Sequence, residues 1–134
     1  MARTFMQMAS EAMAEVTPIS PAETQQCLDD RPDSVLIDVR DLADRRASGM
    51  AAGAIPISAG YLPIRADQEL PVDWRDERLQ DRARPVMTIC ETGALSAIAA
   101  KTLKEMGFRD VAYVEGGTQG WKAAGLPTVP PPDA

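Results

Sequence analysis

Apolar residues recur at helical spacing within the first sixteen residues of the chain. The i, i+3, i+4 pattern predicts an amphipathic helix, whose apolar stripe consists of Phe5, Met8, Ala9, Ala12, Met13 and Val16. Pro18 is expected to end this helix at Thr17, because the residue before a proline avoids helical backbone. The stripe either covers the core of its own chain or contacts a second copy, and we favour the first.

Short apolar runs rich in β-branched residues predict four strands, at residues 35–39, 54–57, 86–89 and 111–114. Helical segments are expected before, between and after these strands, at residues 21–28, 42–47, 95–106 and 118–124. Ser20 and Glu23 form a capping box that begins the first of these helices. Residues 60–85 mix prolines with alternating charges, and they predict a solvated loop with one or two short helices.

Helices that alternate with buried-type strands predict an α/β fold, a mainly parallel sheet with helices on both faces. Sites in such sheets lie at the carboxyl ends of the strands, and Cys90 follows the strand at 86–89. We divide the chain into an N-terminal helix at residues 1–16, a domain at 17–128 and a proline-rich tail at 129–134.

The composition excludes several classes of protein. A length of 134 residues fits one domain. The chain has no histidine, which rules out Ser-His-Asp and Cys-His catalysis and histidine-containing metal sites within it. Its two cysteines are too few for a cysteine-only zinc site, and we expect no metal and no organic cofactor. A net charge of −6 argues against nucleic-acid binding through a basic face.

No apolar stretch is long enough to span a bilayer, and residues 1–16 lack the apolar core of a signal peptide. We therefore expect a cytoplasmic protein that does not act at a membrane. In that compartment Cys27 and Cys90 stay reduced, so a disulfide between them is not expected.

The segment from Cys90 to Ser96 joins a strand to a helix and holds the candidate chemistry. The free N–H groups and the dipole at a helix start favour the thiolate, which is the nucleophilic form of cysteine. Gly93 lets successive N–H groups turn inward as an anion-binding nest, and Ser96 can cap the helix or donate its hydroxyl. A cysteine at the end of a buried strand is equally often a small core residue, so the pattern alone leaves both interpretations open.

Four segments, in this order, resemble the motifs of single-domain rhodaneses, which are sulfurtransferases. They are residues 36–41, 49–57, 90–96 and 115–127. The resemblance covers nearly the whole chain and implies the rhodanese-like three-layer fold. It also implies a two-step reaction, in which Cys90 accepts sulfane sulfur as a persulfide and a thiophilic acceptor then removes it. The loop that would surround this sulfur consists of Glu91, Thr92, Gly93, Ala94, Leu95 and Ser96.

The chain departs from the family pattern at charged positions. Members commonly carry arginine directly after the cysteine and five positions after it, where this chain has Glu91 and Leu95. Phosphatases of this fold need arginine six positions after the cysteine, where Ser96 stands, so phosphate-ester hydrolysis is disfavoured. Met50 replaces the histidine of the second motif.

The orientation of Glu91 decides how well the loop tolerates an anion. A carboxylate about 6 Å from a thiolate opposes it by roughly 3 kcal/mol at an effective dielectric constant of about 20, and by less than about 1 kcal/mol when it points into water. The helix start favours the thiolate by roughly 0.3–2 kcal/mol. We expect thiosulfate to be a poor donor and Glu91→Arg to raise the activity with it. Asp38 and Arg40 share one face of a strand end, and we interpret them as structural support for the neighbouring loop.

Three functions follow from these residues. The first is a sulfurtransferase that uses a persulfide, a polysulfide or a protein as donor. The second is a non-catalytic binding or regulatory module, favoured by the loss of both arginines. The third is a sulfur carrier with little turnover on small donors. The expected partners are a small sulfur donor and a thiophilic acceptor, or proteins in these roles, with the chain as a monomer or homodimer.

Overall fold

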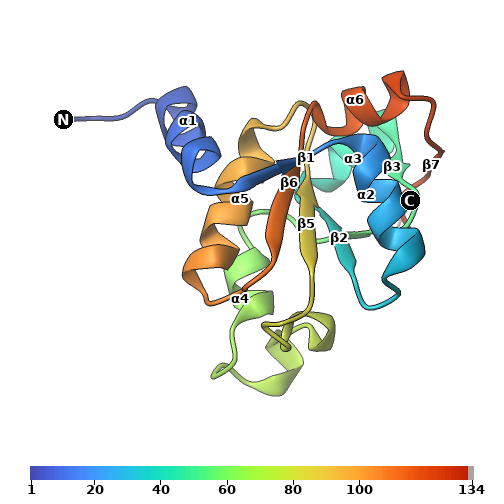
Figure 1. Ribbon diagram of the computed structural model, residues 1–134. Coiled ribbons are helices and arrows are strands. Elements are labelled where there is room, and N and C mark those ends of the chain that lie inside the picture. The colour runs from blue at the N-terminus through green and yellow to red at the C-terminus, as the bar shows by residue number, and fades with distance from the viewer. Residues whose placement is uncertain (133–134) are drawn as a thin grey trace.

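Five strands form one parallel sheet in the computed structural model, which describes residues 1–132 (Figure 1). Their order across the sheet is β1-β6-β5-β2-β4, and every neighbouring pair is parallel. The strands are β1 (Thr17–Ile19), β2 (Val35–Asp38), β4 (Ala54–Pro56), β5 (Val86–Ile89) and β6 (Val111–Val114). The prediction of a mainly parallel α/β sheet is therefore confirmed.

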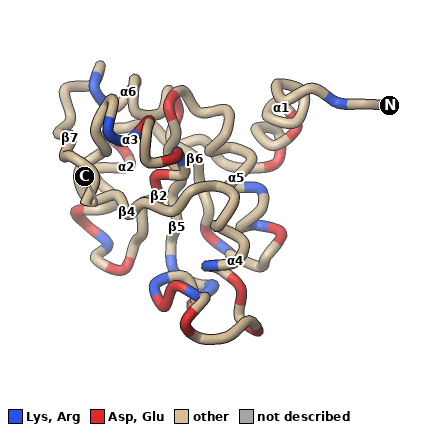
Figure 2. The backbone as a smooth tube through the Cα atoms, turned by 180° about the vertical axis from the view of Figure 1, so that it is seen from behind, with Lys and Arg blue, Asp and Glu red and all other residues tan. Residues whose placement is uncertain are grey.

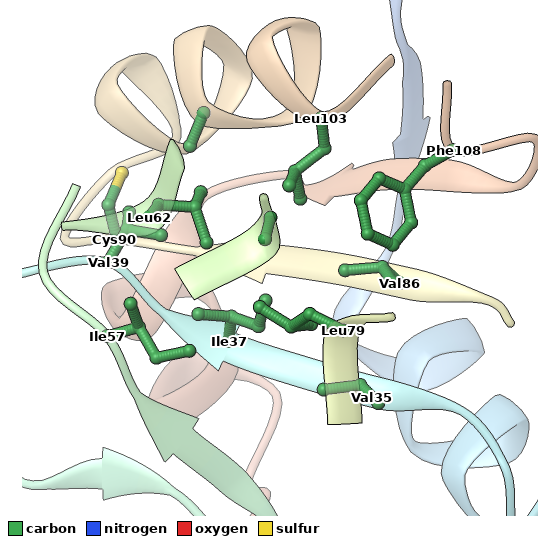
Figure 3. Packing of buried hydrophobic residues seen from close by; sticks show 12 residues of the cluster. Val35, Ile37, Val39, Ile57, Leu62, Leu79, Val86, Cys90, Leu103 and Phe108 are labelled. Carbon is green, nitrogen blue, oxygen red and sulfur yellow. The ribbon is translucent and has the colours of Figure 1, made fainter. Parts of the chain in front are cut away.

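Helices cover both faces of this sheet, as the alternation of elements predicted. They are α1 (Phe5–Glu15), α2 (Pro21–Asp30), α3 (Leu42–Ser48), α4 (Leu62–Ala66), α5 (Ala94–Glu105) and α6 (Gly117–Ala123). On one face, Ile37 of β2 and Val86 of β5 lie in a buried cluster with Leu62 of α4 and Leu103 of α5 (Figure 3). Cys90 lies at one end of this cluster, at the edge of the packed core.

The opposite face of the sheet packs against α2 and α6. Leu36 and Met87 are the neighbours of Ile37 and Val86 in sequence, and they point to this other side because strand residues alternate. Their cluster contains Trp121 of α6, whose indole N–H donates to the Pro127 carbonyl at 2.8 Å. The buried indole thereby finds the polar partner that such a side chain requires.

The N-terminal helix α1 packs against α5 at the outside of the domain (Figure 1). Only the alanines of its apolar stripe, Ala9 and Ala12, are buried within the helix, and the alanines of α5 face them. Small residues on both helices let the two backbones approach closely. Phe5 and Met8 remain half exposed, so α1 covers the core with the small part of its stripe and leaves the large part open.

The sequence did not predict three short strands. Thr17 and Pro18, expected only to end a helix, belong to β1, which pairs with β6. A proline fits there because β1 is an edge strand, where one side needs no N–H donor. The other two are β3 (Met50–Ala51) and β7 (Thr128–Val129), which form a separate antiparallel pair. β3 and β7 have two residues each, too few to show a periodicity, and β1 contains Pro18, which predicts the end of a helix.

Residues on both sides of the expected boundary between domain and tail belong to one strand. The division at 128/129 falls inside β7, and Ala52 N–H donates to the Pro127 carbonyl beside it at 3.0 Å. Residues 133–134 of the expected tail lie outside the described residues. Among residues 1–132, no helix combines the length and the apolar character needed to cross a membrane.

The segment between α4 and β5 carries acidic and basic positions in close alternation (Figure 2). It contains two 3₁₀ turns, η1 (Val72–Trp74) and η2 (Glu77–Leu79), where the sequence predicted short helices in a solvated loop. Leu79 is buried in the cluster beneath α4 and anchors the segment to the domain.

Candidate active site

Cys90 directly follows β5 and is 3% exposed. Its Sγ accepts hydrogen bonds from the backbone N–H groups of Gly93, at 3.1 Å, and Ser96, at 3.3 Å. The Ser96 hydroxyl lies 3.3 Å from the same sulfur. Three donors or donor-capable groups therefore surround one sulfur atom, an arrangement that suits a sulfur bearing negative charge.

The loop reaches this geometry through Gly93, the residue before α5. Its φ of +117° lies in the region that side chains disfavour, and it turns the chain so that its N–H points back at Cys90. The helix that follows, α5, has twelve residues, and its first turn places the Ser96 N–H toward the sulfur. The positive end of the helix dipole is directed at the same atom.

Ser96 holds a hydroxyl proton that has two possible acceptors. The hydroxyl lies 3.1 Å from the Gly93 carbonyl and 3.3 Å from Sγ, and it has one proton to give. When Cys90 is a thiol, the S–H donates to Ser96 and the hydroxyl donates to Gly93. When the sulfur is an anion, the hydroxyl can turn and donate to it, so Ser96 adapts to the state of the sulfur.

The backbone of the loop is held from outside by α6. The carbonyl of Cys90 accepts from the N–H of Thr118, at 2.8 Å, and from its hydroxyl, at 2.9 Å. A Cβ on Gly117 would lie 2.5 Å from the carbonyl carbon of Glu91, so only glycine permits this approach. Sequence reasoning did not identify Thr118 or Gly117 as site residues, although the pair of adjacent glycines there was a signal of close backbone contact.

Arg40 is a buried guanidinium that connects three parts of the site. It bonds both oxygens of Asp38, at 3.1 and 2.7 Å, and donates to the Gly49 carbonyl at 2.7 Å. Its Nη1 is 2.9 Å from Oε1 of Glu91 and also contacts Ser48. Burial lowers the pKa of Arg40, but the hydrogen bonds and charges of Asp38 and Glu91 outweigh this and raise it. Arg40 therefore stays charged and joins β2, α3 and the Cys90 loop.

Glu91 thus points neither directly at the sulfur nor freely into water. Its carboxylate is paired with Arg40, and its side chain is 44% exposed. The partner is 51 positions away in sequence, which is why the sequence could not decide the orientation. The charge of Glu91 is compensated locally, and in turn the guanidinium of Arg40 is occupied by carboxylates.

A pocket of about 410 Å³ opens above Cys90. Its lining comes from the Cys90 loop, the end of β2, the start of α3, the segment after β4 and the start of α1. It consists of Phe5, Val39, Arg40, Asp41, Asp44, Ala59, Gly60, Cys90, Glu91, Thr92, Ala94 and Leu95. Among the predicted loop residues, Gly93 and Ser96 lie behind the sulfur and the others face the pocket. The sequence did not predict that Phe5 lines the pocket, because α1 is brought here by its packing on α5.

No group of three or more Cys, Asp or Glu side chains within residues 1–132 is arranged to hold a metal ion. The chemistry available at the site is that of its sulfur, with N–H donors around it and a half-apolar, half-acidic space above it.

A sequence profile of the rhodanese-like domain matches residues 20–124. A sulfurtransferase of Allochromatium vinosum is 33% identical over 116 residues, which cover 87% of this chain and 97% of the relative. A thiosulfate sulfurtransferase, GlpE, of Glaesserella parasuis is 30% identical over 87% of this chain and 94% of its own length.

Two solved structures are similar over nearly the whole chain. The polysulfide-sulfur transferase homodimer of Wolinella succinogenes has 33% identity and a TM-score of 0.75, covering 93% of this chain and 86% of that one. A Rhodopseudomonas palustris protein of unknown function, described as a possible tyrosine phosphatase, has 28% identity and a TM-score of 0.87, covering 96% of both chains.

Proposed function

The chain belongs to the rhodanese-like domain family, and from this membership we propose that it is a sulfurtransferase that carries sulfane sulfur as a persulfide on Cys90. The observation that carries the proposal is the cradle of the Gly93 and Ser96 N–H groups on Sγ. A small core cysteine needs no such donors, whereas a sulfur that alternates between thiolate and persulfide does.

The reaction has two steps that share this cradle. The Cys90 thiolate attacks the outer sulfur of a donor R–S–SH, the donor S–S bond breaks, and Cys90–S–SH and RS⁻ result. An acceptor thiolate then attacks the outer sulfur of the persulfide, forms R′–S–SH and releases Cys90 as a thiolate. In both steps the negative charge on Sγ changes, and the two N–H groups stabilise it without moving.

Thiosulfate is a poor fit as donor, and this part of the proposal rests on charge. To accept sulfur from thiosulfate, the Cys90 thiolate would have to attack a dianion. The guanidinium of Arg40 cannot offset this charge freely, because it is already bound to Asp38 and Glu91. Carboxylates at the pocket further oppose a dianion. A persulfide donor approaches with less charge and is the donor we favour.

The setting we propose is the cytoplasm, where Cys27 and Cys90, both free thiols in the structure, remain reduced. The donor and acceptor are small sulfur compounds or proteins, and the chain acts as a monomer or a homodimer. A non-catalytic binding module and a sulfur carrier are the alternatives, and the experiment below separates the binding module from proteins that load sulfur on Cys90.

Phosphate-ester hydrolysis remains disfavoured despite the likeness to a possible tyrosine phosphatase. Ser96 occupies the position where phosphatases of this fold carry arginine, and its hydroxyl is engaged with the Gly93 carbonyl and Sγ. Arg40, whose guanidinium lines the pocket, is bound by two carboxylates.

The test is the intact mass of the purified protein before and after exposure to thiosulfate, to polysulfide and to a small alkyl persulfide. Gain of one sulfur, removed by cyanide as thiocyanate, is expected in the wild type and in Cys27→Ala but not in Cys90→Ala. If no donor adds sulfur while Cys90 alkylates no faster than Cys27, the protein is a binding module and the proposal is wrong.

A further inference from the structure

The rim of the Cys90 pocket is acidic. Asp41, Asp44 and Glu91 line it, and Arg40 is the one cationic residue among the described residues that do so, which leaves the lining with a net charge of −2. Glu91 is paired with Arg40, whereas Asp41 and Asp44 are exposed and enter no ion pair with any residue from 1 to 132. Asp41 precedes α3 without capping it through its side chain, so its carboxylate has no structural partner there.

Another part of the pocket lining is apolar and aromatic, and we call it the apolar wall. Phe5 is 47% exposed and reaches the pocket from α1, which lies outside the segment that matches the rhodanese-like domain. Leu95 and Ala59 complete this wall. An aromatic face attracts a cation, and together with nearby carboxylates it disfavours an anion.

We propose that the sulfur donors and acceptors of this pocket are thiols and persulfides that carry a positive charge close to the sulfur. The inference deepens the proposed function and rests on it, because it names the class of substrate that meets the Cys90 sulfur. The sulfur of such a compound reaches Sγ past the apolar wall, and its ammonium or guanidinium lies between Phe5, Asp41 and Asp44. A free aminothiol and a protein cysteine flanked by lysine or arginine share this chemistry.

Transfer to such an acceptor is balanced as a simple exchange. The thiolate of the acceptor attacks the outer sulfur of Cys90–S–SH, a new S–S bond forms in the acceptor persulfide, and the Cys90 thiolate leaves. Two carboxylates within roughly 10 Å of the acceptor charge, partly screened by salt, favour a cationic over an anionic thiol by about tenfold in rate.

The experiment measures this preference with three acceptors of similar size, cysteamine, 2-mercaptoethanol and 3-mercaptopropionate. Cys90 is first loaded with sulfur from polysulfide, and loss of the persulfide is followed by quenched mass analysis. The ratio of the cysteamine to the 3-mercaptopropionate rate is compared between the wild type and Asp41→Asn/Asp44→Asn, because this comparison cancels the intrinsic reactivity of each thiol. We expect the ratio to fall about tenfold in the variant and to fall with added salt in the wild type.

The matched control is Asp73→Asn/Glu77→Gln, which removes two exposed carboxylates from the distant η1–η2 segment and changes the net charge equally. Its ratio is expected to equal that of the wild type. Phe5→Leu keeps the wall apolar but removes the ring, and it is expected to slow cysteamine about threefold and leave 2-mercaptoethanol unchanged. An equal ratio in the wild type and in the Asp41/Asp44 variant overturns the inference.

Two further experiments distinguish small-molecule from protein acceptors, and separate the charge preference of the pocket from its ability to load sulfur. Peptides with cysteine between two lysines or between two glutamates test whether a protein acceptor is taken, and a lysine preference larger than the cysteamine preference assigns the protein source. Cationic, neutral and anionic ethyl methanethiosulfonates convert the Cys90 thiolate to a mixed disulfide and release methanesulfinate, without any sulfane sulfur. If sulfur loading fails, the proposed function fails, and this second series still accepts or rejects the charge preference.

Discussion

Replacing Glu91 by glutamine tests how its pair with Arg40 sets the charge of the pocket. Glutamine keeps an oxygen that can accept from Nη1 of Arg40, now 2.9 Å from the carboxylate, and removes only the negative charge. Arg40 keeps both hydrogen bonds to Asp38. This change is cleaner than Glu91→Arg, because an arginine there would place a second guanidinium against a buried one.

The expected gain follows from Coulomb's law. Removing one negative charge about 7 Å from a bound thiosulfate dianion relieves roughly 1–2 kcal/mol at effective dielectric constants of about 80 to 40. This corresponds to a rise of about 5- to 30-fold in kcat/KM for thiosulfate. The Glu91 side chain is half exposed, and glutamine can still accept from Arg40, so loss of the charge lowers the free energy of unfolding by only about 0.2–1 kcal/mol.

The assay is thiosulfate-to-cyanide sulfur transfer at two salt concentrations, with 2-mercaptoethanol persulfide as a donor that has little charge. The gain should appear with thiosulfate, shrink at high salt and be nearly absent with the persulfide. Glu77→Gln is the matched control, since Glu77 is an exposed glutamate outside the pocket. An equal gain in the control, or an equal gain with both donors, would refute the electrostatic reasoning.

Three further changes probe the loop and the fold. Gly117→Ala places a Cβ 2.5 Å from the Glu91 carbonyl carbon at a positive φ, so the free energy of unfolding should fall by at least about 2 kcal/mol and Tm by roughly 6 °C or more, measured by thermal denaturation; an unchanged Tm would contradict the close approach. Ser96→Ala removes the hydroxyl beside Sγ and should slow alkylation of Cys90 by iodoacetamide about 2- to 12-fold, whereas an unchanged rate would mean that the hydroxyl does not support the thiolate. A hydrogen bond from Arg78 lowers the pKa of Asp76, so the stabilising contribution of Asp76 is present above its pKa in the unfolded chain, about 3.9, and disappears as the pH falls through the lower folded value. Asp76→Asn should therefore make the denaturation midpoint depend less on pH between about pH 4 and pH 2. An unaltered pH dependence in the variant would count against this reasoning.

The sequence predicted the features that depend on neighbouring residues. Four-residue runs such as Val86–Ile89 identified the central strands, and the change from strand to helix around Gly93 placed Cys90 at the carboxyl end of one of them. Ser20 and Glu23 form the expected capping box. Each of these depends on patterns within a few positions, which a single sequence displays.

The sequence could not predict features that depend on distant contacts. Glu91 is oriented by Arg40, and the Cys90 carbonyl is held by Thr118, 28 positions later. Phe5 reaches the pocket only because α1 docks on α5. These contacts are set by the order of strands in the sheet, and no local pattern records that order.

The strand order also decides when the protein can fold during its own synthesis. Thr17 pairs with Ala112, about 95 residues later, and α1 packs on α5, which is made in the second half of the chain. At a translation rate of about 5–20 residues per second, β1 waits roughly 5–20 s for its neighbour. During that interval the apolar residues of α1 are exposed at the ribosome surface, so α1, although made long before α5, is one of the last segments to be packed.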